Sequence, residues 1–196
     1  MKTLILIRHG ETESDKKSDK RHLTATGKRQ INSRAKLLKK FINGRLAIIY
    51  SPTIRARQTA KIIATVFKTS SLSEAELRIK NADLIAKIIH NNESRGMRPA
   101  KTYLKMTDYR RFLVESPMEL FKRLETIIEK YDKETILLVS HEASLEGFLL
   151  AQNKYKIVYK TFSKYFEYGD FAILEPIILD SPSNRPDRII KLNVKI

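Results

Sequence analysis

"LILIRHGETES", residues 4–14, is an apolar run that stops at an arginine, a histidine and a glycine. Residues 3–7 have the length and composition of a buried β-strand, and Arg8, His9 and Gly10 follow where that strand ends. One interpretation is a charged loop after a strand. The other is a phosphate site with a histidine nucleophile. The rest of the sequence has to decide between them.

Two further apolar runs resemble the first. They are "RLAIIYSP" (45–52) and "TILLVSH" (135–141), and helical patterns separate the runs. Strands that alternate with helices predict an α/β protein, here a three-layer α/β/α sandwich around a mostly parallel sheet. Residues 188–196 alternate between apolar and polar side chains, which predicts an antiparallel C-terminal edge strand.

Local patterns predict the remaining elements. Apolar residues at helical spacing indicate helices from Thr24 to Phe41 or Ile42, after Pro52, from Pro117 and after His141. The other expected elements are a strand over 72–79, a short helix over 83–90 and a strand over 168–176. Residues 91–116 have no clean period and are interpreted as an excursion or small cap on a single domain spanning 1–196.

Composition narrows the class of protein. The chain has no cysteine, which excludes disulfides, thiolate zinc sites and a cysteine nucleophile, and which suits the cytoplasm. No apolar run is long enough for a signal peptide or a membrane span, so no membrane association is expected. The net charge of +16 favours anionic partners. Its spread along the chain favours a generally solvated basic surface over a dedicated nucleic-acid face.

The polar residues after the strands have the chemistry of phosphoryl transfer. His9 and His141 each follow a buried strand, and the carboxyl ends of parallel strands meet at one edge of a sheet. Neutral imidazole is a nucleophile that can carry a phosphoryl group. Arg8 and Arg55 supply the positive charge that phosphoryl transfer needs, and Gly10 is expected to let the backbone approach and bind the phosphate.

Other machineries for binding phosphates are absent from the sequence. It contains neither GxxxxGK[ST] nor GxGxxG, and no His, Asp and Glu spacing suggests a metal site. His22 and His90 are interpreted as surface residues. Arg57 lies two residues from Arg55, roughly 200° around the helix, so it should face elsewhere.

The sequence resembles the histidine phosphatase, or phosphoglycerate-mutase-like, superfamily. The likeness rests on "LIRHGET", "SPTIRARQTA" and "LLVSHEASLEGFL" in that order, and "LTATG" and "ESPMELFKRL" also match. It covers about residues 3–150. It implies that His9 becomes phosphorylated, that Arg8, Arg55 and His141 bind the phosphoryl group, and that neither a metal nor another cofactor is needed.

The sequence departs from the family at two positions. Asp15 stands where mutase-type members tend to have asparagine, which weakens the case for mutase activity. Many members have a glutamate general acid in an L-x-E pattern, but counting from Arg55 places Ile79 there. A shifted register makes Leu72-Ser73-Glu74 fit and favours Glu74, with Glu76 and Asp83 as alternatives.

One subgroup lacks the usual acid. "SDKRHLTATGKRQ" (18–30) resembles the small protein-phosphohistidine phosphatases, whereas "ESPMELFKRL" is closer to the broader branch. The sequence therefore predicts a cytoplasmic, metal-independent phosphatase that acts on phosphomonoesters or phosphohistidine, in a small molecule or a phosphoprotein. The alternatives are a phosphoglycerate mutase and a non-catalytic protein of this fold that binds anions or nucleic acid.

Overall fold

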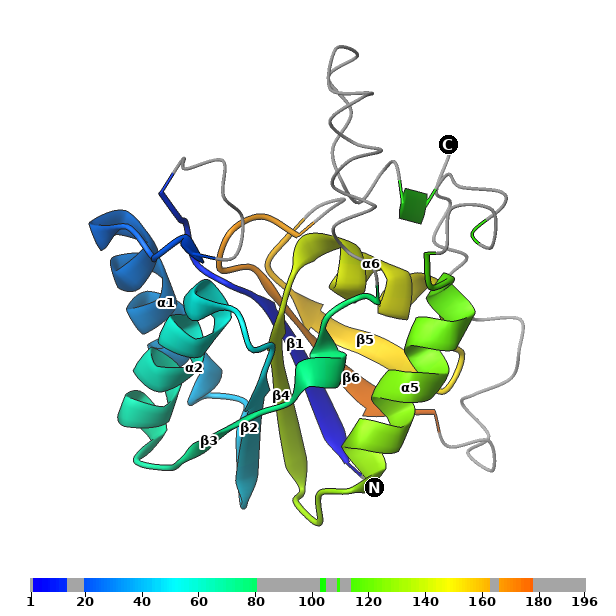
Figure 1. The fold of residues 1–196 in the computed structure, drawn as a ribbon. Coiled ribbons are helices and arrows are strands. Elements are labelled where there is room, and N and C mark those ends of the chain that lie inside the picture. The colour runs from blue at the N-terminus through cyan, green and yellow to red at the C-terminus, as the bar shows by residue number, and fades with distance from the viewer. Residues whose placement is uncertain are drawn as a thin grey trace.

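A six-stranded sheet forms the centre of the molecule (Figure 1). The computed structural model describes residues 2–13, 20–80, 103–104, 109, 114–162 and 166–177. The strands in chain order are β1 (Thr3–Arg8), β2 (Leu46–Tyr50), β3 (Ser71–Ser73), β4 (Thr135–Ser140), β5 (Tyr155–Lys160) and β6 (Phe171–Pro176). In space their order is β3-β2-β4-β1-β6-β5.

The first four strands in this spatial order are parallel, and the last two are antiparallel. β1 pairs with β4 in parallel and with β6 in antiparallel register, and β5 adds to β6 as the outer antiparallel strand. The predicted mixed sheet is therefore confirmed. The sequence analysis missed β5, whose half-exposed pattern of lysines and apolar residues carries an irregular register between Ile157 and Tyr159. The strand predicted over 188–196 lies outside the described residues.

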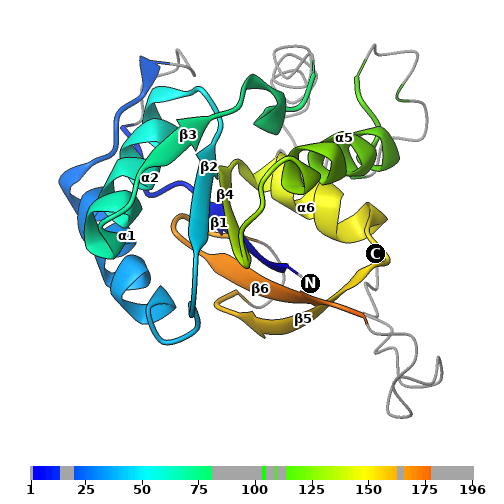
Figure 2. The ribbon, with the colours of Figure 1, turned by 90° about the horizontal axis from the view of Figure 1, so that it is seen from below.

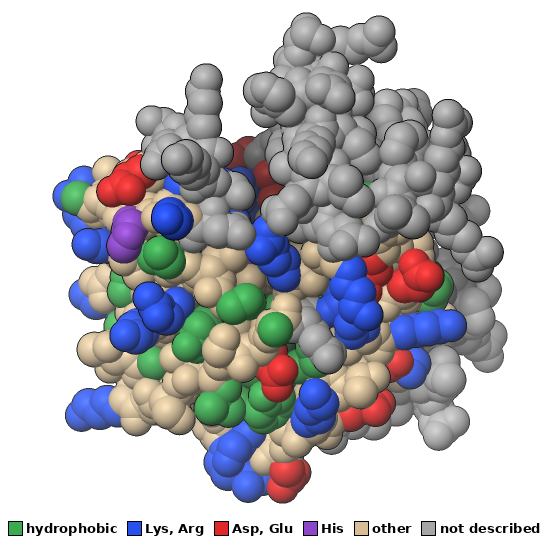
Figure 3. Space-filling view, in the orientation of Figure 1, with side chains coloured by type: hydrophobic (Ala, Val, Ile, Leu, Met, Phe, Trp, Pro, Cys, Tyr) green, Lys and Arg blue, Asp and Glu red, His purple; other side chains and the backbone are tan. Residues whose placement is uncertain are grey.

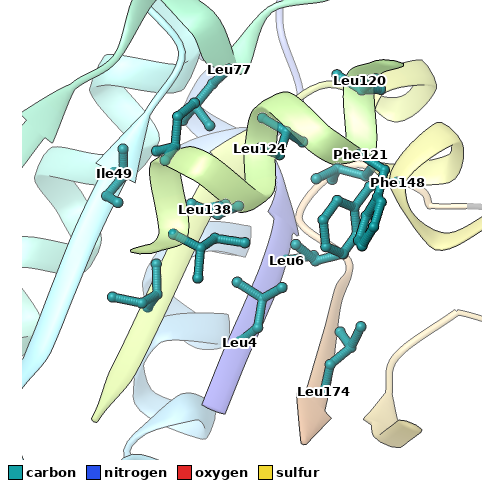
Figure 4. Close-up of a cluster of buried hydrophobic side chains, with 14 of the residues drawn as sticks. Leu4, Leu6, Ile49, Leu77, Leu120, Phe121, Leu124, Leu138, Phe148 and Leu174 are labelled. Atoms are coloured by element: carbon teal, nitrogen blue, oxygen red, sulfur yellow. The ribbon is translucent and has the colours of Figure 1, made fainter. Parts of the chain in front are cut away.

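Helices cover both faces of the sheet (Figures 1 and 2). The helices are α1 (Ala25–Leu38), α2 (Ile54–Phe67), α5 (Pro117–Glu129) and α6 (Glu142–Ala151), with a 3₁₀ turn, η2 (Ala75–Leu77), after β3. Ile5 and Ile7 of β1 pack towards α1 and α2, whereas Leu4 and Leu6 pack towards α5 and α6. Figure 4 shows the second cluster, in which Phe121 meets Phe148. The three-layer sandwich is confirmed.

Side-chain caps fix where three helices begin. Thr24 accepts a hydrogen bond from the Gly27 N–H and Thr53 accepts one from the Ala56 N–H. Ser116 and Glu119 form a capping box at the start of α5. The Thr53 cap starts α2 three residues after β2 ends.

Two boundaries differ from the sequence prediction. α1 ends at Leu38, so Phe41 and Ile42 lie beyond it, because the chain has to turn back to reach β2. The strand expected over 72–79 is only Ser71–Ser73, since η2 follows at once. The helix predicted over 83–90, and most of 91–116, lie outside the described residues. Within the described chain, no helix is long and apolar enough to cross a membrane.

Candidate active site

His9 and His141 come together at the carboxyl ends of β1 and β4. Arg8 and Ser140 are paired in the parallel register, and the His9 N–H donates to the Ser140 carbonyl over 3.2 Å. The imidazole centroids are 5.3 Å apart, with the rings edge to face. Adjacent parallel strands thus bring together two histidines that are 132 positions apart in the sequence.

The guanidinium of Arg55 bridges the two imidazoles. Its Nε donates to His9 Nε2 over 3.1 Å, and its Nη2 lies 3.3 Å from His141 Nδ1. Arg55 is buried in the first turn of α2, whereas Arg57 is exposed, as the helical phase predicts. The site therefore holds a fixed positive charge between two rings.

The hydrogen bonds determine which ring nitrogens carry protons. His9 Nδ1 lies 2.9 Å from the Gly10 carbonyl oxygen, which can only accept, so Nδ1 carries the proton and Nε2 has the lone pair. His141 Nδ1 accepts from Arg55, so its Nε2 carries the proton and donates to Ser51 Oγ over 2.9 Å. The lone pair of each ring points at the guanidinium.

Burial keeps both histidines neutral. Desolvation lowers the pKa of His9 well below 6.5, and the positive charge of Arg55 lowers it further. The pKa of His141 is also lowered, first by burial and then by His9 and Arg55. At neutral pH His9 is therefore an uncharged imidazole with a lone pair on Nε2, which is the form needed for nucleophilic attack.

Arg8 lies beside this cluster and is held on three sides. Its Nη1 donates to the Phe166 carbonyl over 2.6 Å and pairs with Glu142 Oε2 at 2.9 Å. Its guanidinium carbon lies 4.3 Å from the centre of the Tyr168 ring. Its Nε is buried and has no hydrogen-bond acceptor among the described residues. The Nε donor of Arg8 is thus not used by the described residues.

Gly10 allows the loop after β1 to touch α1. A Cβ on Gly10 would lie 2.8 Å from both the Gly27 carbonyl oxygen and Ile31 Cγ1, closer than real Cβ contacts. The Gly10 N–H donates to Thr59 Oγ1 over 3.2 Å. Gly10 therefore positions His9 through close packing rather than through an unusual backbone angle.

A comparison with known protein families identifies the superfamily of the chain. The sequence profile of the histidine phosphatase superfamily (branch 1) matches residues 4–157. The chain belongs to this superfamily. No curated protein sequence matches the chain.

Solved structures of other histidine phosphatases share the fold. A mycobacterial glucosyl-3-phosphoglycerate phosphatase, solved with inorganic phosphate, has a TM-score of 0.54 at 17% identity over 77% of this chain and 78% of that chain. A phosphoserine phosphatase from Entamoeba histolytica, solved with 3-phosphoglyceric acid, has a TM-score of 0.52 at 24% identity over 77% and 79%. At these identities the likeness extends to the fold alone.

Glu74, the residue that the sequence pattern favours as the general acid, lies directly after β3 and before η2. Its Oε1 accepts a hydrogen bond from the Tyr131 hydroxyl over 2.8 Å. Burial and this hydrogen bond raise the pKa of Tyr131 to about 12, so the phenol stays protonated and donates. In the described part of the chain, no hydrogen bond or ion pair joins Glu74 to His9, Arg55 or His141.

The other positions considered for the general acid are Ile79, Glu76 and Asp83, which follow Glu74 in the sequence. Ser140 Oγ donates to the Leu77 carbonyl over 2.9 Å, which holds the end of η2 against the end of β4. Ile79, at the L-x-E position, is buried in the hydrophobic core. Asp83, Asp15 and His90 lie outside the described residues, as does the side chain of Glu76. His22 is exposed, as predicted.

Four residues of the site were missed by the sequence analysis. Ser51 bonds to His141, and Thr59 accepts a hydrogen bond from the Gly10 N–H. Glu142 and Tyr168 both contact Arg8. Ser51, Thr59 and Glu142 lie within the segments "SPTIRARQTA" and "LLVSHEASLEGFL" that carry the family resemblance, so their positions after the strands were a usable signal. Tyr168 had none, because it comes from a turn before β6 that only the fold brings to His9, 5.6 Å between ring centroids.

Proposed function

We propose that this chain is a metal-independent phosphatase in which His9 Nε2 attacks the phosphorus atom and forms a phosphohistidine intermediate. The observation that carries the proposal is the arrangement around His9. Its Nδ1 proton is fixed on the Gly10 carbonyl, and its Nε2 lone pair faces the Arg55 guanidinium. A nucleophile and the charge that stabilises the transition state thus share one small space.

In the first step, the lone pair of His9 Nε2 forms a bond to phosphorus as the bond to the leaving group breaks. When substrate enters, the Arg55 N–H groups turn from the two imidazoles to the phosphoryl oxygens, which frees the lone pair. The buried Nε of Arg8 supplies another donor. His141 borders the same oxygens. In the second step, water attacks the phosphohistidine, releases phosphate and restores His9.

The leaving group needs a proton in the first step when it departs as an alkoxide. Glu74 is the favoured donor from the sequence pattern, with Glu76 and Asp83 as alternatives. The bond between Glu74 and Tyr131 would then have to open during turnover. For a phosphohistidine substrate, the departing imidazole needs less help, so no carboxylic acid would be required.

The substrate is proposed to be a phosphomonoester or a phosphohistidine. Two solved histidine phosphatases are named for glucosyl-3-phosphoglycerate and for phosphoserine, and both names describe small phosphorylated compounds. From these names we infer for this chain only that its substrate is phosphorylated. The cytoplasm remains the proposed location.

A leaving-group series tests the proposal and the acid together. Aryl phosphates, alkyl phosphates and phosphohistidine are offered to the wild type and to Glu74→Ala, Glu76→Ala and Asp83→Ala. Loss of the acid should cost about 10²–10⁴-fold on alkyl phosphates and little on aryl phosphates. If no variant shows this difference and phosphohistidine is preferred, the enzyme works without the acid. Inactivity on all three substrate types would refute the phosphatase.

EDTA treatment tests the absence of a metal requirement. Activity of the wild type should survive EDTA, because Arg8 and Arg55 supply the charge that a metal would otherwise provide. Vanadate, which mimics pentacoordinate phosphorus, should inhibit. Loss of activity with EDTA, restored by a divalent ion, would contradict the metal-independent mechanism.

A further inference from the structure

The positive charge of the chain is concentrated in one segment. Residues 20–73 contain 13 of the 38 lysines and arginines and none of the 22 aspartates and glutamates. The other 142 residues contain 25 basic and 22 acidic residues, so they are nearly neutral. The segment accounts for 13 of the 16 net positive charges. A generally solvated basic surface would not be divided in this way.

The fold turns this segment into one outer layer of the molecule. It builds α1, β2, α2 and β3, and the two helices lie side by side over one face of the sheet (Figures 1 and 2). We define the basic face as the eight exposed lysines and arginines on or directly after these helices: Lys28, Arg29, Lys36, Lys39, Lys40, Arg57, Lys61 and Lys68. In Figure 3, several blue side chains stand out among tan and green over α1 and α2, and most red side chains lie elsewhere.

The cations of the basic face are not neutralised by neighbours. None of the eight forms an ion pair with an acidic residue of the described chain. On the opposite side, Lys154 pairs with Glu125 at 2.5 Å, and Arg123 pairs with the buried Glu115. The difference lies in the placement of acidic residues, since both layers contain lysine and arginine.

This arrangement costs stability. Arg57 and Lys61 are like charges at i and i+4 within α2, which destabilise a helix by about 0.2–0.5 kcal/mol per pair. Neither α1 nor α2 has an acidic residue in its first turn, where one would favour the helix dipole. Exposed acidic residues would relieve both costs, so their absence needs another explanation.

The cations form rows. On α2, Arg57 and Lys61 lie four residues apart, which is about 6 Å along the axis, and Lys68 follows directly after the helix. On α1, Arg29 and Lys36 lie seven residues apart, which is about 10 Å along the axis, and Lys40 follows the end of the helix. Each helix is about 21 Å long, and double-stranded DNA carries one negative charge per about 1.7 Å of its axis. Two rows of this length match a regular polyanion better than a single small ligand.

We propose that the basic face binds the phosphate backbone of nucleic acid without sequence specificity. In the described part of the chain, α1 and α2 themselves expose no large apolar side chain, and Phe41, which follows Lys40, is one such side chain beside the basic face. A helix that binds a membrane surface inserts such side chains, so nucleic acid fits better than lipid. Exposed Asn32, Ser33 and Thr65 lie among the cations and are of the types that hydrogen-bond phosphate oxygens. The proposal does not depend on the proposed phosphatase activity.

The experiment compares two variants of equal net charge. One replaces Lys36, Lys40 and Lys61 of the basic face with glutamate. The matched control replaces Lys122, Lys130 and Lys133, on or after α5, with glutamate. Binding of a labelled DNA duplex of about 20 base pairs and arbitrary sequence is measured by fluorescence anisotropy between about 50 and 200 mM salt. Circular dichroism and thermal unfolding show whether each variant is folded.

The affinity of the wild type should fall steeply as the salt concentration rises. Each phosphate contact should lower the logarithm of the binding constant by about 0.9 for each tenfold increase in salt. The basic-face variant should lose about 10²-fold or more in affinity, and its salt slope should be shallower by about 3. The control should lose much less near 150 mM salt, where charges more than about 8 Å away are screened. A second variant, with glutamine at the same three lysines, covers the case that glutamate disturbs the helices. It should lose DNA affinity too, but less than the glutamate variant.

Four outcomes would overturn the proposal. One is equal loss of binding in the basic-face variant and the control, because binding would then follow net charge alone. Another is absence of DNA binding by the wild type at low salt. The third is binding to vesicles of phosphatidylserine and phosphatidylcholine that is tighter than binding to DNA, which would assign the face to a membrane surface. Unchanged DNA binding in a folded basic-face variant would also overturn the proposal, because the three lysines would then not contact the DNA.

Discussion

Arg55 and Arg57 lie two residues apart on α2 in opposite surroundings. Arg55 is buried against both imidazoles, and Arg57 is exposed on the basic face. Arg55→Ala should slow the chemical step by about 10²–10³-fold, the usual effect of removing one donor that stabilises developing charge. Arg57→Ala should change it by less than about threefold. Steady-state kinetics on an aryl phosphate measure both, and similar losses would mean that the wrong arginine has been assigned.

Tyr168 is expected to position Arg8 through its ring rather than its hydroxyl. The Arg8 guanidinium carbon lies 4.3 Å from the ring centre, and such cation–π contacts are worth about 0.5–2 kcal/mol. Tyr168→Phe should keep kcat/KM near wild type, whereas Tyr168→Leu should lower it by about 3–30-fold. If Phe and Leu have the same effect, the ring does not hold Arg8.

At the residue level, the sequence predicted which side chains would meet but not how they would bond. His9, His141 and Arg55 all follow buried strands, so the edge of a parallel sheet was enough to bring them together. The proton positions on the two rings depend on the Gly10 carbonyl and Ser51, whose orientations no pattern in the sequence encodes. The same is true of Tyr168.

At the level of elements, the loop after β1 and the first turn of α1 depend on two glycines. A Cβ on Gly27 would lie 2.1 Å from the Glu11 carbonyl oxygen, which is backbone and cannot move aside cheaply. Gly27→Ala should therefore destabilise the protein by more than about 1 kcal/mol, although helix propensity alone predicts a gain of up to about 1 kcal/mol.

Urea unfolding of the Gly27→Ala variant measures this difference. Ser33→Ala, at an exposed position of the same helix, is the control and should change the unfolding free energy by less than about 0.5 kcal/mol. A Gly27→Ala protein that is more stable than the wild type would contradict the tight contact between this loop and α1.

The sequence predicted the long elements better than the short ones. β1, β2 and β4 are continuous apolar runs, and Thr24, Thr53 and Ser116 mark helix starts with hydrogen-bonding caps. β3 has three residues, and β5 is half exposed, so neither carries a clear pattern. The two were misjudged because strand pairing with β2 and β6, rather than local sequence, creates them.

For the whole molecule, the two buried neutral histidines make stability sensitive to acid. Below pH 6.5 the unfolded chain protonates His9 and His141, but the folded chain does not until their lowered pKa values are reached. The unfolding free energy should therefore decrease as the pH is lowered through this window, by up to about 1.4 kcal/mol per pH unit for each histidine. At pH values above the window, neither histidine contributes to the pH dependence.

Urea unfolding at a series of pH values tests this account. The His9→Ala/His141→Ala double variant should show a shallower fall below pH 6.5 than the wild type. A double variant as acid-sensitive as the wild type would show that these two histidines do not titrate as described.

The distribution of charge was also present in the sequence, but its meaning depended on the fold. The absence of acidic residues over 20–73 can be counted directly. Only the packing of α1 and α2 as neighbours on one face of the sheet converts that count into a surface. The sequence-based expectation of a generally solvated basic surface was drawn without this segregation.

Phosphohistidine on His9 is the central claim, and trapping it is the most direct measurement. Wild-type enzyme is mixed with a radiolabelled phosphate ester, denatured in alkali within the first turnover, and digested for peptide mapping. The label should be stable in alkali, labile in acid and confined to the peptide that contains His9. His9→Ala should carry none, whereas His141→Ala should still be labelled. Equal labelling of the wild type and His9→Ala, or label on a peptide without His9, would contradict the account.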